Sequence, residues 1–139
     1  MEATTAAAGS RRPIPAPSPL TAPYWAACRR GELAIQRCAR CGRLVHLPEV
    51  ACPFCGGAEL PYEAVTGHGT VHTFTVVHRT FLPGFIPPYI VAWIDIAEGA
   101  RAFGDVVDCL PEDVRIGLPV RVCFEDLPGF GPIPRWRPR

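Results

Sequence analysis

Two short cysteine pairs decide the fold of this chain: Cys38-Ala39-Arg40-Cys41-Gly42 and Cys52-Pro53-Phe54-Cys55-Gly56. Two residues between the thiols let one turn of backbone direct both sulfurs at one ion, and the glycine after each pair allows that turn to reverse. The segment between the pairs can form a hairpin that brings the two turns face to face. The pattern predicts a closed, structural metal site made by four thiolates: Cys38, Cys41, Cys52 and Cys55.

The alternatives to a metal site fit the pattern less well. Two disulfides would be expected in a secreted chain, but no secretory signal accompanies the pairs. A redox Cys-x-x-Cys centre normally stands alone before a helix, whereas these pairs flank strand-like segments. Tetrahedral thiolate geometry suits zinc and iron alike, and rubredoxin-type sites share the Cys-Gly endings. We expect structural zinc, with iron as the alternative.

Length and composition frame this site. The chain has 139 residues, enough for one ordinary domain or for two small ones if a metal stabilises the smaller. The net charge is +1 and only 19% of the residues are charged, so there is no broad cationic field for a nucleic-acid backbone. Seventeen prolines favour extended segments and loops over long helices. We expect no nucleic-acid partner and no helical bundle.

The N-terminal segment 1–20 is rich in Ala, Pro, Ser and Thr and has no hydrophobic periodicity, which predicts a disordered tail. Arg11-Arg12 is typical of a twin-arginine export signal, but prolines follow where an uninterrupted apolar region is needed. No run approaches the ~18 apolar residues of a membrane span. We therefore expect no membrane association, and a cytoplasmic location because thiolates suit a reducing compartment.

Residues 21–58 are predicted to form a short helix and the zinc ribbon. Thr21 can cap a helix of about two turns that ends at Gly31. Strand-like segments 33–36, 43–46 and 48–51 then lead into and out of the two cysteine pairs. Within the helix, Tyr24 and Trp25 are either core anchors or part of a binding surface.

Residues 59–139 are predicted to form a second domain with a C-terminal tail. Hydrophobic alternation predicts a long strand over 71–78, and the apolar segment 89–96 predicts a strand buried on both faces. A hairpin turn at 97–100, a return strand over 101–107 and a last strand over 120–124 complete a set of about five antiparallel strands. The expected fold class is mainly β: a short N-terminal helix, a rubredoxin-like zinc ribbon and a small antiparallel barrel of the OB type.

No catalytic group is expected from the remaining reactive residues. Cys28, Cys109 and Cys123 lie in apolar or strand contexts, where an inert thiol is the common state. No acid, base and nucleophile set for a thioester hydrolase is apparent. The glycines beside His68 permit close approach by a ligand, but the same pattern is typical of a tight turn.

The proline-stiffened segment 79–88 offers Phe81 and Phe85 together with two aliphatic side chains. Apolar residues on such a loop are typical of a protein interface or of a wall for an acyl chain. The equally weighted alternative is a lid over the core of the barrel itself.

The order of elements and several local phrases resemble a known family. The matching phrases are LAIQRCARC at 33–41, Cys52-Pro53-x-Cys55-Gly56, Gly67-x-Gly69-Thr70-Val71, 74–79, Pro88-Tyr89, 94–99, 116–120 and the proline-flanked ending at 133–138. The chain resembles bacterial and archaeal acyl-CoA-associated proteins that join an N-terminal helix and a zinc ribbon to an OB fold, long catalogued as a domain of unknown function. The resemblance covers about residues 19 to 138.

The resemblance implies a partner and not a reaction. Members of this family accompany thiolase-like enzymes, including the lipid-transfer-protein type that acts as an aldolase on steroid side chains. It implies that helix and ribbon contact that enzyme and that the OB domain helps to form its CoA-thioester channel. We expect a non-catalytic companion subunit in a hetero-oligomer, sharing an acyl-CoA substrate with a partner that performs retro-aldol or acyl-transfer chemistry. Candidate contacts to partner or acyl-CoA are Tyr24, Trp25, His68, Phe81 and Phe85. The alternative is a nucleic-acid-binding module, because zinc ribbons and OB folds often serve there.

Overall fold

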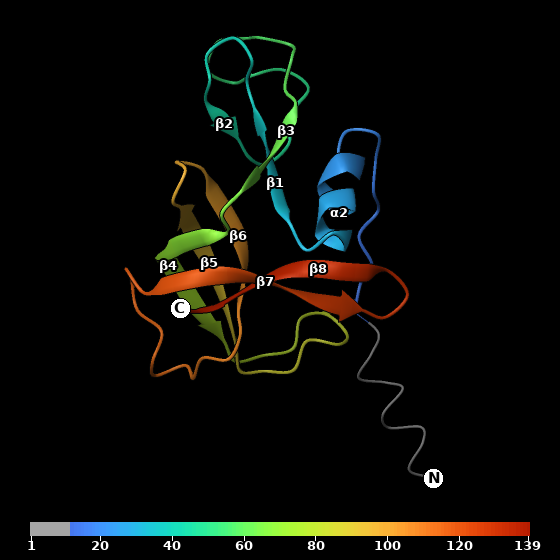
Figure 1. Ribbon diagram of the computed structural model, residues 1–139. Coiled ribbons are helices and arrows are strands. Elements are labelled where there is room, and N and C mark those ends of the chain that lie inside the picture. Colours follow the sequence, from blue (N-terminus) through green and yellow to red (C-terminus); the bar gives the residue numbers. More distant parts are fainter. Residues whose placement is uncertain (1–11) are drawn as a thin grey trace.

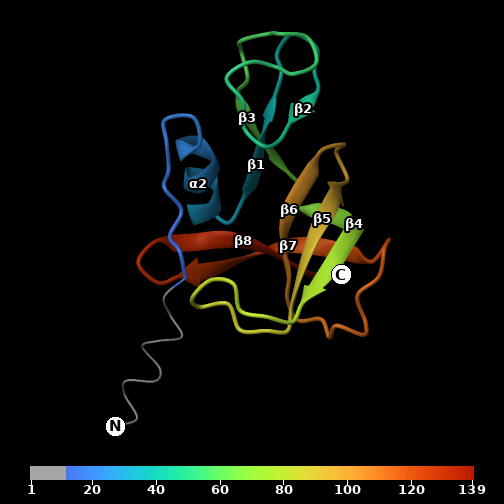
Figure 2. The same ribbon diagram turned by 180° about the vertical axis from the view of Figure 1, so that it is seen from behind.

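The computed structural model describes residues 12–139, so residues 1–11 of the predicted tail lie outside the described residues. Figure 1 shows the small sheet of the predicted zinc ribbon (β1 to β3) standing on a small barrel (β4 to β8), with the helix α2 beside the place where the two meet. Figure 2 shows the same arrangement from behind. No helix in the described part of the chain is long and apolar enough to cross a membrane.

The helix α2 spans Ala22–Arg29 and has Pro23 in its first turn, as predicted. Thr21 occupies the N-cap position, but its side chain makes no capping bond. The Thr21 hydroxyl instead accepts a hydrogen bond from the Ser18 N–H at 2.9 Å, within a turn that precedes the helix. Gly31 ends the helix with a φ of +75° that favours glycine.

The ribbon sheet has the order β2-β1-β3, with β1 (Leu33–Arg37), β2 (Leu44–Val45) and β3 (Tyr62–Val65) all antiparallel. β2 is shorter than predicted, and no strand forms over 48–51. β3 pairs with β1 along most of its length. Since β1 is almost wholly buried, its backbone groups need partners on both edges, and the two residues of β2 cover only one end.

The barrel is closed and has the strand order β4-β5-β6-β8-β7. Its strands are β4 (His68–Val77), β5 (Tyr89–Ile96), β6 (Arg101–Val106), β7 (Pro119–Leu127) and β8 (Gly131–Pro138). The predicted OB-type barrel is confirmed, with one difference: β8 runs parallel to β6 where they meet, and all other neighbours are antiparallel.

The prediction that 120–124 is the last strand is wrong, because β8 closes the barrel. Prolines at 132, 134 and 138 argue against a strand here, because proline is rare inside a sheet. The Val107 N–H donates to the Trp136 carbonyl (2.7 Å), so the even-numbered residues of β8 face β6. The missing proline N–H groups therefore all fall on that edge, while the residues between them keep their N–H groups for β7.

The prediction that residues 89–96 are buried on both faces is also wrong. Burial alternates along β5, with Ile90 and Ile94 inside the barrel and Trp93 39% exposed on its outer face. The apolar run reflects pairing on the outer surface, because the Trp93 and Phe103 rings lie across β5 and β6 with centroids 5.0 Å apart.

One main core joins the barrel to the base of the ribbon. Ile94, Val120 and Trp136 fill the barrel, and Leu33 and Ile35 of β1 extend the same cluster into the ribbon. A separate small cluster lies at the far end of the ribbon and contains the buried residues Cys38, Val45 and Cys52. The two ends of the ribbon are thus packed independently.

Candidate metal centre and ligand cavities

The two cysteine pairs adopt the same turn. The Cys38 N–H donates to the Arg43 carbonyl (2.9 Å), and the Cys52 N–H donates to the Gly57 carbonyl (2.8 Å). Gly42 and Gly56 each return an N–H to the carbonyl of the first cysteine at 2.8 Å, with φ values of +76° and +78°. Only glycine adopts these angles without strain, which is why each pair ends in Cys-Gly.

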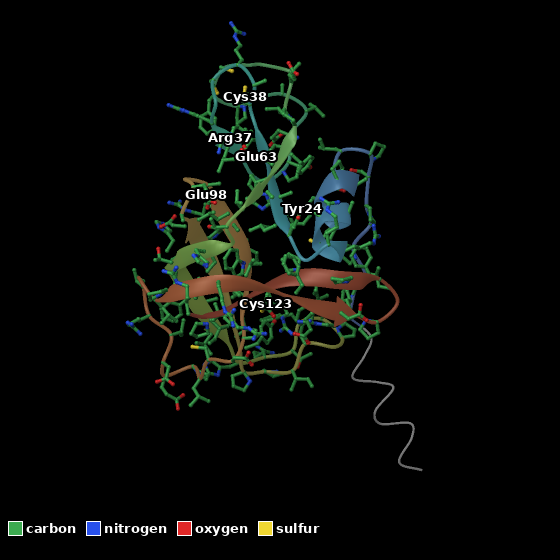
Figure 3. All side chains as sticks on the ribbon, in the orientation of Figure 1. Tyr24, Arg37, Cys38, Glu63, Glu98 and Cys123 are labelled. Atoms are coloured by element: carbon green, nitrogen blue, oxygen red, sulfur yellow. The ribbon has the colours of Figure 1, made fainter. Side chains whose placement is uncertain are left out.

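The four thiols lie within 4.8 Å of one another. Cys38 Sγ is 3.5 Å from Cys55 Sγ, and Cys41 Sγ is 3.6 Å from Cys52 Sγ. A tetrahedral ion with metal–sulfur bonds of ~2.3 Å requires sulfur separations of roughly 3.8 Å, close to these values. Figure 3 shows the sulfurs gathered near Cys38 at the far end of the ribbon. The four cysteines are therefore arranged to bind a metal ion.

Backbone amides around the thiols favour their charged form. N–H groups of Cys41, Phe54 and Gly57 approach the sulfurs of Cys38, Cys52 and Cys55 at 3.5, 3.4 and 3.4 Å. The amide of Cys41 is the main cause that lowers the pKa of Cys38 to about 6. At Cys55 the amide of Gly57 also lowers the pKa, but burial and hydrogen bonds with the other thiols outweigh it and raise the pKa to about 11. Four thiolates complete a tetrahedral shell, which leaves no position for water or substrate, so the site has the character of a structural centre.

The loop between the two pairs is fixed to β1 by a buried amide. Gln36 Nε2 donates to the Glu49 carbonyl (3.0 Å), and the Glu49 N–H donates to Gln36 Oε1 (2.8 Å). The side chain thus satisfies both polar groups of one loop residue, as a buried amide must. Gln36 was not predicted as a functional residue, since a lone glutamine in a strand carries no signal.

Tyr24 and Trp25 lie where α2 meets the ribbon and the barrel. Tyr24 stacks on His46 with centroids 5.8 Å apart, and burial raises the pKa of the Tyr24 phenol well above its usual range. Burial likewise lowers the pKa of His46. Trp25 meets Phe130, from the turn between β7 and β8, edge to face at 5.1 Å. Both helix aromatics therefore serve as anchors between elements.

A cavity of about 310 Å³ lies between α2, the barrel and the N-terminal segment. Three of the five predicted contact residues line it: Tyr24, Trp25 and Phe85. Phe103 and Val91 on the outer face of the barrel complete an apolar wall. Neither residue was predicted to line a cavity: segment 89–96 was expected to be buried on both faces, and Phe103 was assigned only to the return strand 101–107.

Arg12 also lines this cavity, although residues 12–20 were predicted to belong to the disordered tail. Its guanidinium lies 4.3 Å from the centre of the Phe85 ring, and its Nη2 is 3.8 Å from Asp105 Oδ2. These contacts are cation–π and ionic, so a composition dominated by Ala and Pro gives no sign of them.

The other two predicted contact residues lie elsewhere. Phe81 is 73% exposed in the loop between β4 and β5, and Leu82 and Ile86 are also exposed, so this loop is not a lid over the barrel core. His68 is the first residue of β4, paired with Arg121, and not part of a turn. The turn is limited to Thr66 and Gly67, because the edge of β7 is free to pair with the residues that follow.

A second, larger hollow is an open groove of about 790 Å³ between α2 and the ribbon sheet. Pro23 and Ala26 of the helix and Ala34, Leu60 and Tyr62 of the ribbon line it. The thiol of Cys28, also in α2, is buried, which raises its pKa to about 11 and makes it a poor nucleophile.

Comparison with known protein families gives two matches along the chain. The ChsH2 rubredoxin-like zinc ribbon domain matches residues 25–61, and the ChsH2 C-terminal OB-fold domain matches residues 62–125. One chain of a solved Ltp2-ChsH2(DUF35) aldolase superposes with a TM-score of 0.82 and 33% identity, covering 89% of this chain and 98% of that one.

Three sequence relatives carry related descriptions. A DUF35 domain-containing scaffold protein of Methanothermobacter thermautotrophicus is 32% identical over 69% of this chain and 74% of its own. The 3-oxo-4,17-pregnadiene-20-carboxyl-CoA hydratase alpha subunit of Mycobacterium tuberculosis is 35% identical over 89% of this chain. The benzoylsuccinyl-CoA thiolase subunit BbsA of Geobacter metallireducens is 30% identical over 66% of each chain.

The chain spans only 39% of the length of the mycobacterial hydratase subunit. It matches almost the whole of the aldolase chain and three quarters of the scaffold protein, and its own zinc ribbon precedes its barrel. The chain belongs to the DUF35 family of zinc-ribbon and OB-fold proteins.

Proposed function

We propose that this chain is a non-catalytic companion subunit that binds a thiolase-like enzyme and helps to form the channel for its CoA-thioester substrate. The observation that carries the proposal is the likeness, at 33% identity and a TM-score of 0.82, to nearly all of one chain of an Ltp2-ChsH2(DUF35) aldolase. The relative described as a benzoylsuccinyl-CoA thiolase subunit supports the same class of partner. Retro-aldol or acyl-transfer chemistry then belongs to the partner.

The open groove between α2 and the ribbon is the proposed docking surface for the enzyme. Its walls are mostly small and apolar, with Pro23, Ala26 and Leu60 among them. Val50, at the rim, is 77% exposed. Arg30, Glu32 and Glu49 also line the groove, and a mostly apolar surface with some charged residues is typical of a protein interface.

The smaller cavity is the proposed contribution to the substrate channel. Its volume, about 310 Å³, falls at the lower end of the range for small-molecule sites. Trp25, Phe85 and Phe103 give it an aromatic wall suited to an acyl or pantetheine chain. Phe81 and Ile86 on the adjoining loop continue the apolar surface outward, where a partner would cover them.

Zinc is the proposed ion of the thiolate centre, with a structural role. It would hold the ribbon at a fixed angle to α2 and the barrel, so that one surface is presented to the enzyme. Elemental analysis of the purified chain distinguishes zinc from iron, since both fit four thiolates.

Co-expression with candidate thiolase-like proteins from the same organism tests the assembly. Size-exclusion chromatography with light scattering is expected to give a hetero-oligomer with the wild-type chain. Ala26→Arg, which places a charge in the groove, is expected to weaken assembly at least about tenfold. Ala97→Arg, in the exposed turn between β5 and β6, is the matched control and is expected to assemble normally. A monodisperse chain that ignores every such enzyme would overturn the proposal.

Phe85→Ala tests the channel separately from the interface. The complex is expected to form with unchanged stoichiometry, whereas the KM of the partner for its acyl-CoA rises because part of the apolar wall is lost. An unchanged KM together with normal assembly would argue that the cavity does not contact the substrate.

A further inference from the structure

The outer face of three neighbouring strands carries a row of basic side chains. His68 of β4 pairs directly with Arg121 of β7, and Arg121 pairs directly with Arg137 of β8. Directly paired residues have their side chains on the same face, with Cβ atoms about 5 Å apart. Since Val120 is fully buried inside the barrel, its neighbour Arg121 points outward.

Arg139 extends this group at the end of β8. Its Nη1 lies 2.9 Å from His68 Nδ1, so the last arginine folds back toward β4. Both views place the C-terminus beside β4 and β7 (Figures 1 and 2). We call His68, Arg121, Arg137 and Arg139 the basic row.

The neutralisation of positive charge declines along β8. Arg135 binds both Asp105 and Glu125. Arg137 is 3.5 Å from Asp108 Oδ2, but its buried Nε makes no hydrogen bond. Within residues 12–139, Arg121 and Arg139 have no carboxylate within ion-pair distance. Two guanidinium groups without an ion-pair partner in the described part of the chain therefore lie at one end of the barrel.

The contact with Arg139 defines the hydrogen-bonding role of His68 Nδ1. A guanidinium carries only donors, so Nδ1 must accept and the imidazole proton sits on Nε2. His68 thus offers a further N–H donor next to the guanidinium forks. Forks of this kind match the oxygens of a phosphate group in geometry and in charge.

We propose that the basic row binds a phosphate ester of a small, soluble nucleotide. Like charges directly opposite one another on neighbouring strands are destabilising, and a bound dianion would relieve their repulsion. The row is three strands wide and the net charge of the chain is only +1. One phosphate group fits this patch, whereas a nucleic-acid backbone needs an extended cationic track. The inference does not depend on the proposed enzyme partner; in an acyl-CoA complex, the phosphate would be one of coenzyme A.

Titration of the full metal-loaded chain, without a partner, tests the proposal. Adenosine 3′,5′-bisphosphate is the probe, and calorimetry together with the imidazole resonances of His68 reports binding. We expect saturable binding that Arg121→Gln weakens about tenfold, since a charge-assisted bond is lost. Arg79→Gln removes an equal charge just beyond the opposite end of β4 and is expected to bind like the wild type. Equal unfolding midpoints of the variants verify that each one folds.

Three results would overturn the proposal. One is the absence of saturable binding, and another is an equal loss in Arg79→Gln and Arg121→Gln, which would indicate attraction to overall charge only. The third is tighter, Arg121-dependent binding of a single-stranded oligonucleotide, which would assign the row to nucleic acid. Unphosphorylated adenosine is expected not to bind. Because the chain is tested alone, failure here leaves the companion role intact, and failure of the enzyme complex leaves the phosphate site intact.

Discussion

The far end of the ribbon and the barrel differ in the amount of apolar surface that each one buries. The barrel encloses side chains as large as Ile94 and Trp136, each at most 2% exposed. At the far end of the ribbon, Val45 is buried beside Cys38 and Cys52, while Phe54 is exposed. Hydrophobic burial can therefore stabilise the barrel, whereas the end of the ribbon requires the bonds of a metal ion.

The ribbon itself contains both a part stabilised by hydrophobic burial and a part that depends on metal bonds. Leu33 and Ile35, at its base, belong to the barrel's core. Leu44 of β2 joins the same core, although it pairs with Arg37 directly before the first cysteine turn. A metal ion bound by the four cysteines and the core of the barrel would thus support different parts of the same short sheet. Loss of one support is expected to leave the other end folded.

Replacement of Cys38 by Ser is expected to have the largest effect. Structural zinc contributes ~10–16 kcal/mol in finger peptides, and this free energy is lost with the ion. Amides of residues 38–57 should lose their protection from hydrogen exchange, while those of β5 and β6 keep it. Cys109→Ser is the control and should retain one metal ion per chain. Cooperative loss of protection in both regions would refute the division.

Replacement of Ile94 by Ala is expected to have the second largest effect. The side chain is fully buried, and a cavity in its place costs about 2–5 kcal/mol of the free energy of unfolding. Denaturant titration measures the loss, and the absorption of a cobalt-substituted thiolate site should stay unchanged under native conditions. The neighbouring Trp93 side chain points to the outer face, so Trp93→Ala should lower the free energy of unfolding much less. Similar losses in the two variants would contradict the assignment of the inner face.

The sequence predicts those features of the fold that depend on local spacing. The Cys-x-x-Cys-Gly turns follow from the reach of one backbone turn, and the β5–β6 hairpin follows from two apolar strands around Ala97 to Gly99. β8 escapes prediction because its prolines are tolerated only through the edge on which they fall, which depends on the neighbouring strand. The pairing of β3 with β1 is likewise a non-local contact.

In the candidate site, too, residue type could be predicted from the sequence, but contacts between distant segments could not. Aromatic type identified Tyr24, Trp25 and Phe85 as candidate contacts, and the structure brings all three to one cavity. Arg12 could not be found, because its contacts with Phe85 and Asp105 join parts of the chain that are far apart in sequence. The basic row was missed because strand register, not sequence proximity, brings Arg121 beside His68 and Arg137.

Glu98 is expected to contribute less to stability than the metal site or the barrel core, but it lies where the ribbon joins the barrel. Its carboxylate accepts hydrogen bonds from the Thr66 N–H (2.6 Å) and hydroxyl (3.2 Å), in the linker from β3 to β4. Figure 3 labels Glu98 at this junction. Glu98→Gln should cost about 1 kcal/mol, because the bond loses its charge. Residual dipolar couplings should then show a wider range of ribbon orientations, whereas unchanged couplings would mean that the shared core alone fixes the angle.

Asp95 is expected to make the smallest contribution, and it tests whether surface charge matters to the barrel. Partial burial would raise the pKa of its carboxyl, but hydrogen bonds from Arg101 (2.8 Å) and His72 (2.9 Å) outweigh burial and lower the pKa. A lowered pKa in the folded state stabilises the barrel above the ordinary carboxyl pKa of about 4, and this stabilisation is lost as the pH falls through the folded value. Because these side chains are about half exposed, we expect Asp95 to contribute only a few tenths of a kcal/mol to the free energy of unfolding.

Unfolding followed by barrel amide signals at pH 5 and pH 3 measures this change in stability, and Asp95→Asn should reduce it. An equal pH dependence in the variant would assign the acid sensitivity of the barrel to other carboxylates, and metal release, recorded in parallel, separates it from protonation of the thiolates.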